Sequence, residues 1–167
     1  MAENKEAIIV TFGNFKDGTG KTTNSTMIAQ ALSMKAYKVL LFDQDPQANT
    51  TSIYLKTKAL DSDEIVSLNK ILMTVIQEEN LAQIVTEVKG NLYLLPSFSD
   101  FAFYPRFLEK KFPNDKTTRV QYFPSLIEPS KKITILSLQM YRKQFPPLQM
   151  QRFMLLFCSS CTANTRA

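Results

Sequence analysis

A glycine-rich loop between a strand-like and a helix-like segment constrains this chain more than any other feature. Residues 13–20 hold three of the four glycines in the 167-residue sequence. Before them, residues 7–12 form an apolar, β-branched run typical of a buried strand. After them, residues 21–35 place apolar side chains at helical spacing, and residues 38–42 form a second apolar run. This order predicts a βαβ unit and therefore a parallel sheet covered by helices.

Several further elements follow from the hydrophobic pattern. We expect an amphipathic helix over residues 65–76, a short helix over 81–85 and a strand over 91–96 that ends at a proline. The aromatic-rich residues 98–112 are expected to pack in the core, because basic residues do not interleave the first half of the segment as they would in a base-stacking surface. The core face of the first helix is expected to carry Met27, Ile28, Ala31, Leu32 and Met34.

The loop itself has the chemistry of a phosphate site. Its sequence is Asn14-Phe-Lys-Asp-Gly-Thr-Gly-Lys-Thr-Thr23, with Phe15 where the general P-loop pattern has its first glycine. Glycines let backbone N–H groups turn toward an anion, and the following helix directs the positive end of its dipole to the same place. Lys21 would contact the β- and γ-phosphates, and the Thr22 hydroxyl would bind Mg²⁺. The alternative is a glycine-rich turn that merely precedes a helix.

A second lysine, Lys16, precedes Lys21 by five residues. With it, the loop resembles the deviant Walker A motif of the ParA and MinD partition and positioning ATPases, Lys-Gly-Gly-x-Gly-Lys-Thr-Thr. The resemblance implies that Lys16 is catalytic, together with Lys21, and reaches across an ATP-dependent homodimer to the partner's nucleotide. Taken alone, Lys16 would be a solvated loop charge. The ATP-binding residues that the resemblance implies are Asp17, Gly18, Thr19, Gly20, Lys21, Thr22 and Thr23.

The second apolar run continues the match. It leads into Asp43-Gln-Asp-Pro-Gln-Ala-Asn49, which resembles the Asp-x-Asp-Pro-Gln-Gly-Asn sequence of ParA proteins. Carboxylates at the carboxyl end of a strand lie where open α/β sheets place ligand chemistry. The resemblance implies that Asp43 belongs to the Mg²⁺ and water shell and that Asp45 is a catalytic residue that positions the attacking water. The alternative for this pair is a capped turn at Asp-Pro.

The resemblance covers residues 5–132 and includes the segment Asn91-Leu-Tyr-Leu-Leu-Pro-Ser97. It implies an α/β P-loop NTPase fold of three layers with a mostly parallel sheet, of which residues 1–132 are the N-terminal half. It also implies a Mg-dependent ATPase of plasmid or chromosome partition, with ATP and Mg²⁺ as cofactors. The implied partners are a second copy, a centromere-binding ParB-like protein and non-specific DNA, but no membrane. The implied location is the cytoplasm, in association with the nucleoid.

Two departures from the family pattern affect these expectations. Asp17 stands where the motif has its first glycine, and its carboxylate would repel the triphosphate, so we expect weaker ATP binding or impaired dimerisation. Beyond Lys132 the family has an acidic strand, Walker B, whereas residues 133–142 contain no acidic residue. Lys132-Ile-Thr-Ile can be encoded by AAG ATT ACG ATT, and the frame that begins one base earlier encodes Asp-Tyr-Asp. We therefore predict that residues 133–167 are an out-of-frame tail, poorly ordered and unrelated to the family.

Charge and composition limit the other functions open to the chain. Residues 1–128 carry 14 basic and 15 acidic side chains, and residues 129–167 carry 6 basic and no acidic ones, so the excess of +5 lies in the tail. The absence of histidine excludes histidine-based acid–base catalysis and His-ligated metals. Two alternatives remain beside an active ATPase. One is a nucleotide-binding remnant without Walker B that turns over little, and the other is a DNA-binding module formed by the basic tail.

Overall fold

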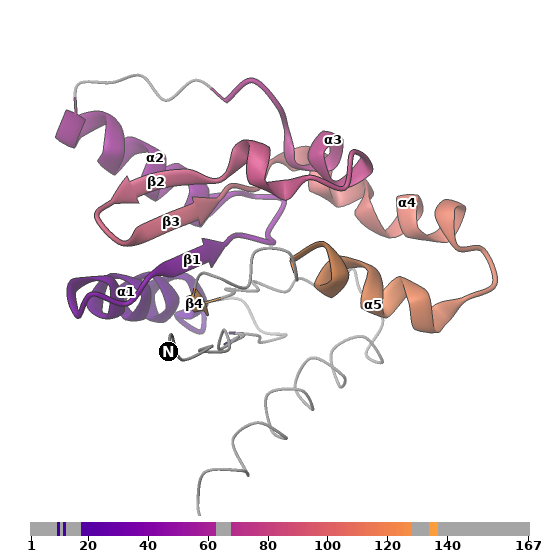
Figure 1. Ribbon diagram of the computed structural model, residues 1–167, viewed down its shortest axis with the longest axis horizontal. Coiled ribbons are helices and arrows are strands. Elements are labelled where there is room, and N and C mark those ends of the chain that lie inside the picture. The colour runs from indigo at the N-terminus through magenta and orange to yellow at the C-terminus, as the bar shows by residue number, and fades with distance from the viewer. Residues whose placement is uncertain (1–9, 11, 13–17, 63–67, 128–133, 137–167) are drawn as a thin grey trace, which may run out of the picture.

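The fold is known from a computed structural model, which describes residues 10, 12, 18–62, 68–127 and 134–136 (Figure 1). Three predicted elements are confirmed: the first helix, the strand after it and the strand before Pro96. The short helix after Asn80 is also present, as a single 3₁₀ turn. In chain order, the elements are α1 (Lys21–Met34), β1 (Val39–Phe42), α2 (Asn49–Ser62), α3 (Leu72–Gln77), η1 (Leu81–Ile84), β2 (Thr86–Lys89), β3 (Leu92–Leu95), η2 (Ser99–Phe103), α4 (Tyr104–Lys111), α5 (Lys116–Ile127) and β4 (Thr134–Leu136).

The described strands form one mostly parallel sheet in the order β2-β3-β1-β4. β1 pairs in parallel with β3 on one side, where Val39 lies opposite Leu92, and with β4 on the other, where Val39 lies opposite Thr134. β2 pairs antiparallel with β3 at the edge. The predicted α/β class with a mostly parallel sheet is therefore confirmed. Of the strand expected at residues 7–12, only Val10 and Phe12 are described, and both pack on the side of the sheet that faces α1.

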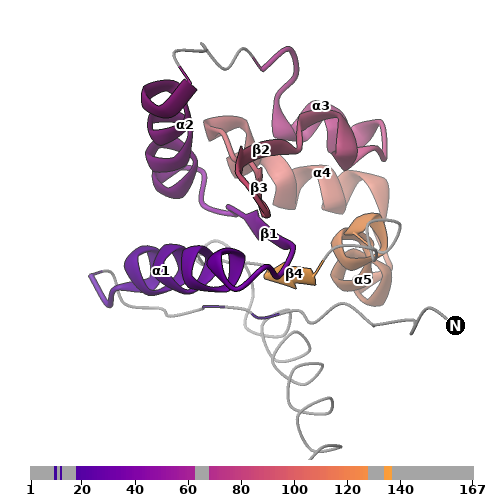
Figure 2. The same cartoon turned by 60° about the vertical axis from the view of Figure 1, so that its left-hand side comes forward.

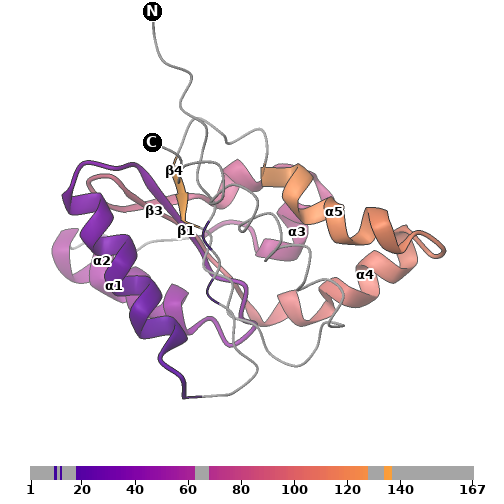
Figure 3. The same ribbon diagram turned by 90° about the horizontal axis from the view of Figure 1, so that it is seen from below.

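Helices cover both faces of the sheet, which gives three layers (Figure 2). Side chains alternate along β1 because successive residues of a strand point to opposite faces. Val39 and Leu41 pack with Ala29 of α1 and Tyr54 of α2, whereas Leu40 and Phe42 pack with α3, α4 and α5. The view from below shows the same division, with α1 and α2 on one side and α3, α4 and α5 on the other (Figure 3).

The larger core is aromatic, as predicted for residues 98–112. Phe101 and Leu108 are buried in it, and Phe98, Phe107 and Phe112 pack against it. Phe103 is the exception, with 60% of its surface exposed.

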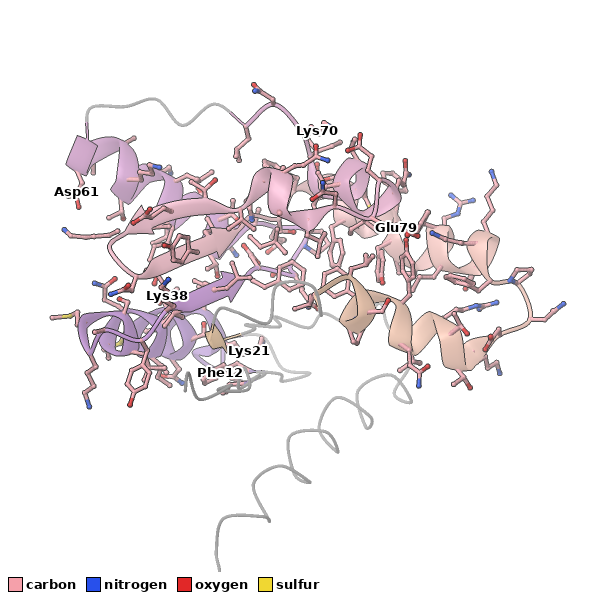
Figure 4. The ribbon with its side chains drawn as sticks, viewed as in Figure 1. Phe12, Lys21, Lys38, Asp61, Lys70 and Glu79 are labelled. Atoms are coloured by element: carbon pink, nitrogen blue, oxygen red, sulfur yellow. The ribbon has the colours of Figure 1, made fainter. Side chains whose placement is uncertain are left out.

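At the rim of this core, Lys111 of α4 joins Tyr122 of α5 to Glu79, which follows α3 and is labelled in Figure 4. Its Nζ donates to Glu79 Oε1 and to the Tyr122 hydroxyl, both at 2.7 Å, and lies 4.4 Å from the centre of the Tyr122 ring.

Of the expected core face of α1, Leu32 is half-buried and packs against the smaller core, but the rest is wrong. Met27 and Met34 are 65% and 78% exposed, and Ile28 is exposed as well, whereas the buried residues of α1 are Ser25 and Ala29. The face of α1 toward the sheet therefore carries the small residues Ser25 and Ala29 together with Leu32.

The helix expected over residues 65–76 is also shorter than predicted. Its described part, α3, begins only at Leu72, and residues 63–67 lie outside the described ranges.

Six elements were not predicted: α2, β2, η2, α4, α5 and β4. α2 and α5 are rich in threonine and polar residues, and β2 has the single apolar residue Val88 among Thr86, Glu87 and Lys89, so none of these three shows a strong hydrophobic period. In the described residues, no helix is long and apolar enough to cross a membrane.

Candidate nucleotide-binding site

Two glycines set the backbone that leads into α1. Gly18 and Gly20 have φ angles of +72° and +75°, in the left-handed region that other residues enter only at a cost of about 1–2 kcal/mol. Among the described residues, no atom lies within 4 Å of a Cβ built at Gly18, and the nearest atom to one at Gly20 is Asn24 Nδ2 at 3.5 Å. Backbone conformation, and not lack of space, therefore requires glycine at both positions.

The start of α1 has features of an anion site. Gly20 is the N-cap residue, and in the described part of the chain no side chain caps it and no acidic residue lies in the first turn. The first backbone N–H groups of a helix lack partners within the helix, and they carry the positive end of its dipole. Lys21, Thr22 and Thr23 form this first turn, as the sequence predicts. Figure 4 labels Lys21 at its start. The predicted site residues Lys16 and Asp17 lie outside the described residues.

Asp43, immediately after β1, is almost completely buried and strongly held. It is 1% exposed. Its Oδ2 accepts from the Thr51 N–H at 2.9 Å and from the Thr51 hydroxyl at 2.8 Å, and its Oδ1 accepts from the Asp45 N–H at 3.1 Å. Burial raises the pKa of the Asp43 carboxyl; the hydrogen bonds from Thr51 and Asp45 oppose this effect, and the nearby charge of Asp45 adds to it. Sequence reasoning identified Asp43 but missed Thr51.

Asp45 is 5% exposed and forms the turn into α2. Its Oδ1 accepts from the Gln47 N–H at 2.9 Å, and its carbonyl accepts from the Ala48 N–H at 2.8 Å. In this structure Asp45 caps the turn at Asp-Pro, as the alternative interpretation of the sequence expected. The role of Asp45 in positioning the attacking water stays a prediction. Ala48 has a φ angle of +52°. It occupies the position where the resembling motif has glycine, which explains why the motif uses that residue.

The start of α1 and the two carboxylates lie toward the same end of the sheet. α1 and the strand that follows it, β1, run in opposite directions, so the start of α1 and the end of β1 face the same way (Figures 1 and 3). β3 is parallel to β1 and is followed by Pro96 and Ser97, which brings Ser97 to the same edge. The Ser97 N–H donates to the Thr51 hydroxyl oxygen at 2.9 Å. Sequence reasoning noted Ser97 as part of a matching segment but gave it no role.

The described oxygen-bearing side chains near the start of α1 suit Mg²⁺ that is bound together with a nucleotide. They do not form a metal site made of protein ligands alone. In the described ranges, no three Asp, Glu, Cys or His side chains converge on a possible metal position. Mg²⁺ in phosphate sites is typically held by one or two protein groups together with substrate phosphates and water. Thr22 in the first turn of α1 and the buried carboxylate of Asp43 are such groups.

The buried charge of Asp43 predicts a pH-dependent stability difference. Because the folded state raises its pKa, the folded protein binds more protons than the unfolded chain between pH 3.8 and the raised pKa. Stability therefore falls as pH rises through this window, and the penalty is fully present above it. The amide of the Asp43→Asn variant carries no charge, so the free energy of unfolding of this variant relative to wild type should increase over the same window. Each pKa unit by which folding raises the pKa of Asp43 corresponds to about 1.4 kcal/mol in the free energy of unfolding.

Urea unfolding of both proteins at a series of pH values from acidic to neutral measures this difference. Asp61→Asn is the control, because Asp61 is exposed and pairs with Lys89 at the surface. Parallel stability curves for wild type and Asp43→Asn would contradict the prediction.

Comparison with known proteins now places the chain in a family. Residues 7–128 match the AAA_31 family of AAA domains. The chain belongs to this family. The family is ParA/MinD-like, which confirms the resemblance predicted from the loop and from the segment after β1. The solved structures agree on the P-loop NTPase fold.

A plasmid partition protein of Borrelia burgdorferi B31, solved with AMPPNP, superposes on this AAA_31 domain with a TM-score of 0.68 at 21% identity. The match covers 90% of this chain and 60% of that one. Cobyrinic acid a,c-diamide synthase of Mycobacterium smegmatis, solved with ADP and magnesium, gives 0.62 at 20% identity and covers 79% and 50%. A predicted replication protein A of Rhizobium rhizogenes is 44% identical over 46 residues, which are 28% of this chain and 11% of that protein. The chain thus spans much less than the full length of these relatives.

Proposed function

We propose that this AAA_31 domain binds Mg-ATP at the start of α1 and serves in plasmid or chromosome partition. One observation carries the proposal. Gly18 and Gly20, both in the left-handed conformation, lead into the first turn of α1, which bears Lys21 and contains no acidic residue, at the same end of the sheet as the buried Asp43. The partition protein that shares the fold was solved with an ATP analogue, which supports the assignment.

The proposal gives each residue a chemical role. Backbone N–H groups of residues 17–23 surround the phosphates, Lys21 neutralises the β- and γ-phosphate charge, and the Thr22 hydroxyl binds Mg²⁺. Asp43 accepts a hydrogen bond from a water of the ion's shell, and Asp45 orients the attacking water. Lys16 acts across a homodimer to stabilise the charge of the transition state. Bound Mg²⁺ would supply charge neutralisation at the phosphates.

The proposed partners follow from the same family assignment. They are a second copy in an ATP-dependent dimer, a centromere-binding ParB-like protein that stimulates hydrolysis, and DNA without sequence preference. We place the protein in the cytoplasm in association with the nucleoid, with DNA contact weak in this chain.

Titration of labelled ATP into the full chain, with Mg²⁺ and with EDTA, tests the proposal. We expect saturable binding that Mg²⁺ strengthens. Unlabelled ATP should reverse the binding, whereas adenosine should not, because the proposed site recognises phosphates. Absence of saturable binding under both conditions would refute it. An ATPase assay with and without DNA and the ParB-like protein then measures turnover.

A second candidate function is a nucleotide-binding remnant that turns over little. The sequence around β4 favours this function. β4 pairs with β1, which leads into Asp43, but residues 133–142 contain no acidic residue. A Walker B carboxylate is therefore missing from this stretch. ATP binding without turnover, even with DNA and partner present, would support the remnant over the active enzyme.

The missing carboxylate also supports a frameshift near Lys132. We propose that residues 133–167 are translated out of frame and form no part of the family domain, which would be residues 1–132. The described part of this tail is β4, whose Thr-Ile-Leu sequence can pair with β1 through backbone hydrogen bonds alone. The nucleotide sequence decides the matter. A frame beginning one base earlier that encodes no ParA-like continuation would refute the frameshift.

Asp17 is predicted to weaken the proposed site. A carboxylate about 4 Å from a triphosphate is repelled by several kcal/mol at an effective dielectric constant of about 20. We therefore expect Asp17→Gly to bind ATP at least tenfold more tightly, or to dimerise at lower protein concentration, than wild type. Labelled-ATP titration and sedimentation measure the two effects. Asp115→Gly, a change of the same kind at an exposed loop between α4 and α5, is the control. Equal affinity and equal dimerisation of Asp17→Gly and wild type would refute the prediction.

A further inference from the structure

A buried threonine connects the three segments that meet at Asp43. Thr51, in the first turn of α2, is 3% exposed. Its N–H and its hydroxyl both donate to Asp43 Oδ2, at 2.9 and 2.8 Å. Its hydroxyl oxygen also accepts from the Ser97 N–H at 2.9 Å. One side chain thus joins the end of β1, the start of α2 and the segment after β3.

These partners fix the direction of the Thr51 hydroxyl. A hydroxyl group has one hydrogen and two lone pairs. The Ser97 amide can only donate, so it occupies a lone pair of Thr51 Oγ1, and the hydroxyl hydrogen is left for the Asp43 carboxylate. Hydrogen bonds to a carboxylate are roughly twice as strong as neutral ones. Asp43 Oδ2 is therefore held by two donors from α2, while Oδ1 is held by the Asp45 N–H at 3.1 Å.

We propose that Thr51 is a positioning residue for the Mg-nucleotide, which holds the Asp43 carboxylate in the orientation that serves the water shell of the ion. The inference rests on the proposed function. Without the hydroxyl, Oδ2 keeps only the backbone donor, and the carboxylate can turn about its broad terminal torsion. Loss of such an outer-shell partner typically lowers metal affinity or activity by about 10- to 100-fold.

The neighbouring residue provides a matched control. Thr50 is 1% exposed on the same turn of α2, and its hydroxyl oxygen has no hydrogen-bond partner in the part of the chain that the structure describes. Thr50→Val and Thr51→Val therefore make the same change of atoms at adjacent buried positions. Only the second change removes a hydrogen bond to Asp43. Thr51→Ser keeps the hydroxyl and should rescue the function.

The experiment measures the affinity of the full chain for labelled ATP with Mg²⁺ and with EDTA, after circular dichroism has shown that each variant is folded. We expect Thr51→Val to lose about tenfold or more of the affinity gained from Mg²⁺, with its affinity in EDTA unchanged. Thr51→Ser and Thr50→Val should keep the gain. If Thr51→Val does not fold, Thr51→Ala carries the same expectation.

The outcomes separate this inference from the proposed function. Equal loss of affinity with and without Mg²⁺ would show that Thr51 acts on the fold only, and would overturn the inference. A Mg²⁺ gain in Thr51→Val equal to that of wild type would also overturn it and leave the proposed function standing. If wild type itself binds no ATP, the proposed function fails and this inference fails with it.

Discussion

Lys21→Ala should lower the affinity for Mg-ATP by about a hundredfold while the fold stays intact. Lys21 is the first residue of α1, directly after the left-handed Gly20, and the proposal places its ammonium group on the β- and γ-phosphates. A hydrogen bond to a charged group contributes about 1.5–3 kcal/mol, and 2.7 kcal/mol is roughly a hundredfold in affinity. The remaining backbone N–H groups of the loop would still attract the phosphates, so binding should be weakened and not abolished.

Lys35→Ala is the matched control for this experiment. Lys35 is the C-cap residue at the opposite end of the same helix and is exposed. Both variants remove one positive charge from α1, so a general electrostatic effect on ATP would appear in both. Calorimetric titration with Mg-ATP should show the large loss in Lys21→Ala alone. A similar small loss in both variants would argue against a phosphate site at the start of α1.

The candidate site could be predicted from the sequence where its residues belong to one short motif. Gly18, Gly20 and Lys21 lie within four consecutive positions, and both the chemistry of the residues and their place between a strand and a helix identify them. Thr51 and Ser97 could not be found in this way, because they are 8 and 54 residues from Asp43 in the chain. Only the folding of β1, α2 and β3 brings them together. A threonine shortly after an Asp-x-Asp-Pro turn is the one local signal that could have suggested Thr51.

The fold was predictable where burial is complete and not where it is partial. β1 and β3 are buried on both faces and appear as continuous apolar runs. β2 lies at the edge, alternates between half-buried and exposed residues, and carries one apolar side chain. The Gly90-Asn91 pair before β3 could still have indicated a hairpin, because such a pair favours a two-residue loop. In the structure, Gly90 has the positive φ angle, +55°, that this kind of loop requires.

For α1 the hydrophobic pattern was clear, but the face that it predicted to be buried is largely exposed. Met27, Ile28 and Met34 are exposed, and α1 packs against the core of the sheet through Ala29 and the half-buried Leu32. Hydropathy ranks residues by the free energy of burial and takes no account of how close two elements must come. The buried residues of α1 are the small Ser25 and Ala29, so side-chain size, which hydropathy does not rank, also bears on the face that this helix buries.

The largest expected effect on stability comes from Phe123→Ala. Phe123 of α5 is 6% exposed, and its ring stacks on Phe42 with 4.7 Å between centres and an angle of 2°. It also meets Tyr104 and Phe101 edge to face, at 5.7 and 6.4 Å. Truncation of a buried phenylalanine costs about 3–5 kcal/mol, a large part of the roughly 5–15 kcal/mol that stabilises a typical domain. Urea unfolding followed by circular dichroism should show a much lower midpoint.

Phe103→Ala is the control, because Phe103 lies in the same aromatic segment of the sequence as Phe101 but is 60% exposed. Its midpoint should stay close to that of wild type, and equal losses in the two variants would contradict the packing described for α5. The stack also links stability to the site, since Phe42 is the last residue of β1 and directly precedes Asp43. Phe123→Ala should therefore weaken ATP binding under conditions where most of the protein is still folded. The aromatic core lies on the opposite face of the sheet from α1. Weaker ATP binding in this variant would therefore show that the site needs packing on both faces of β1.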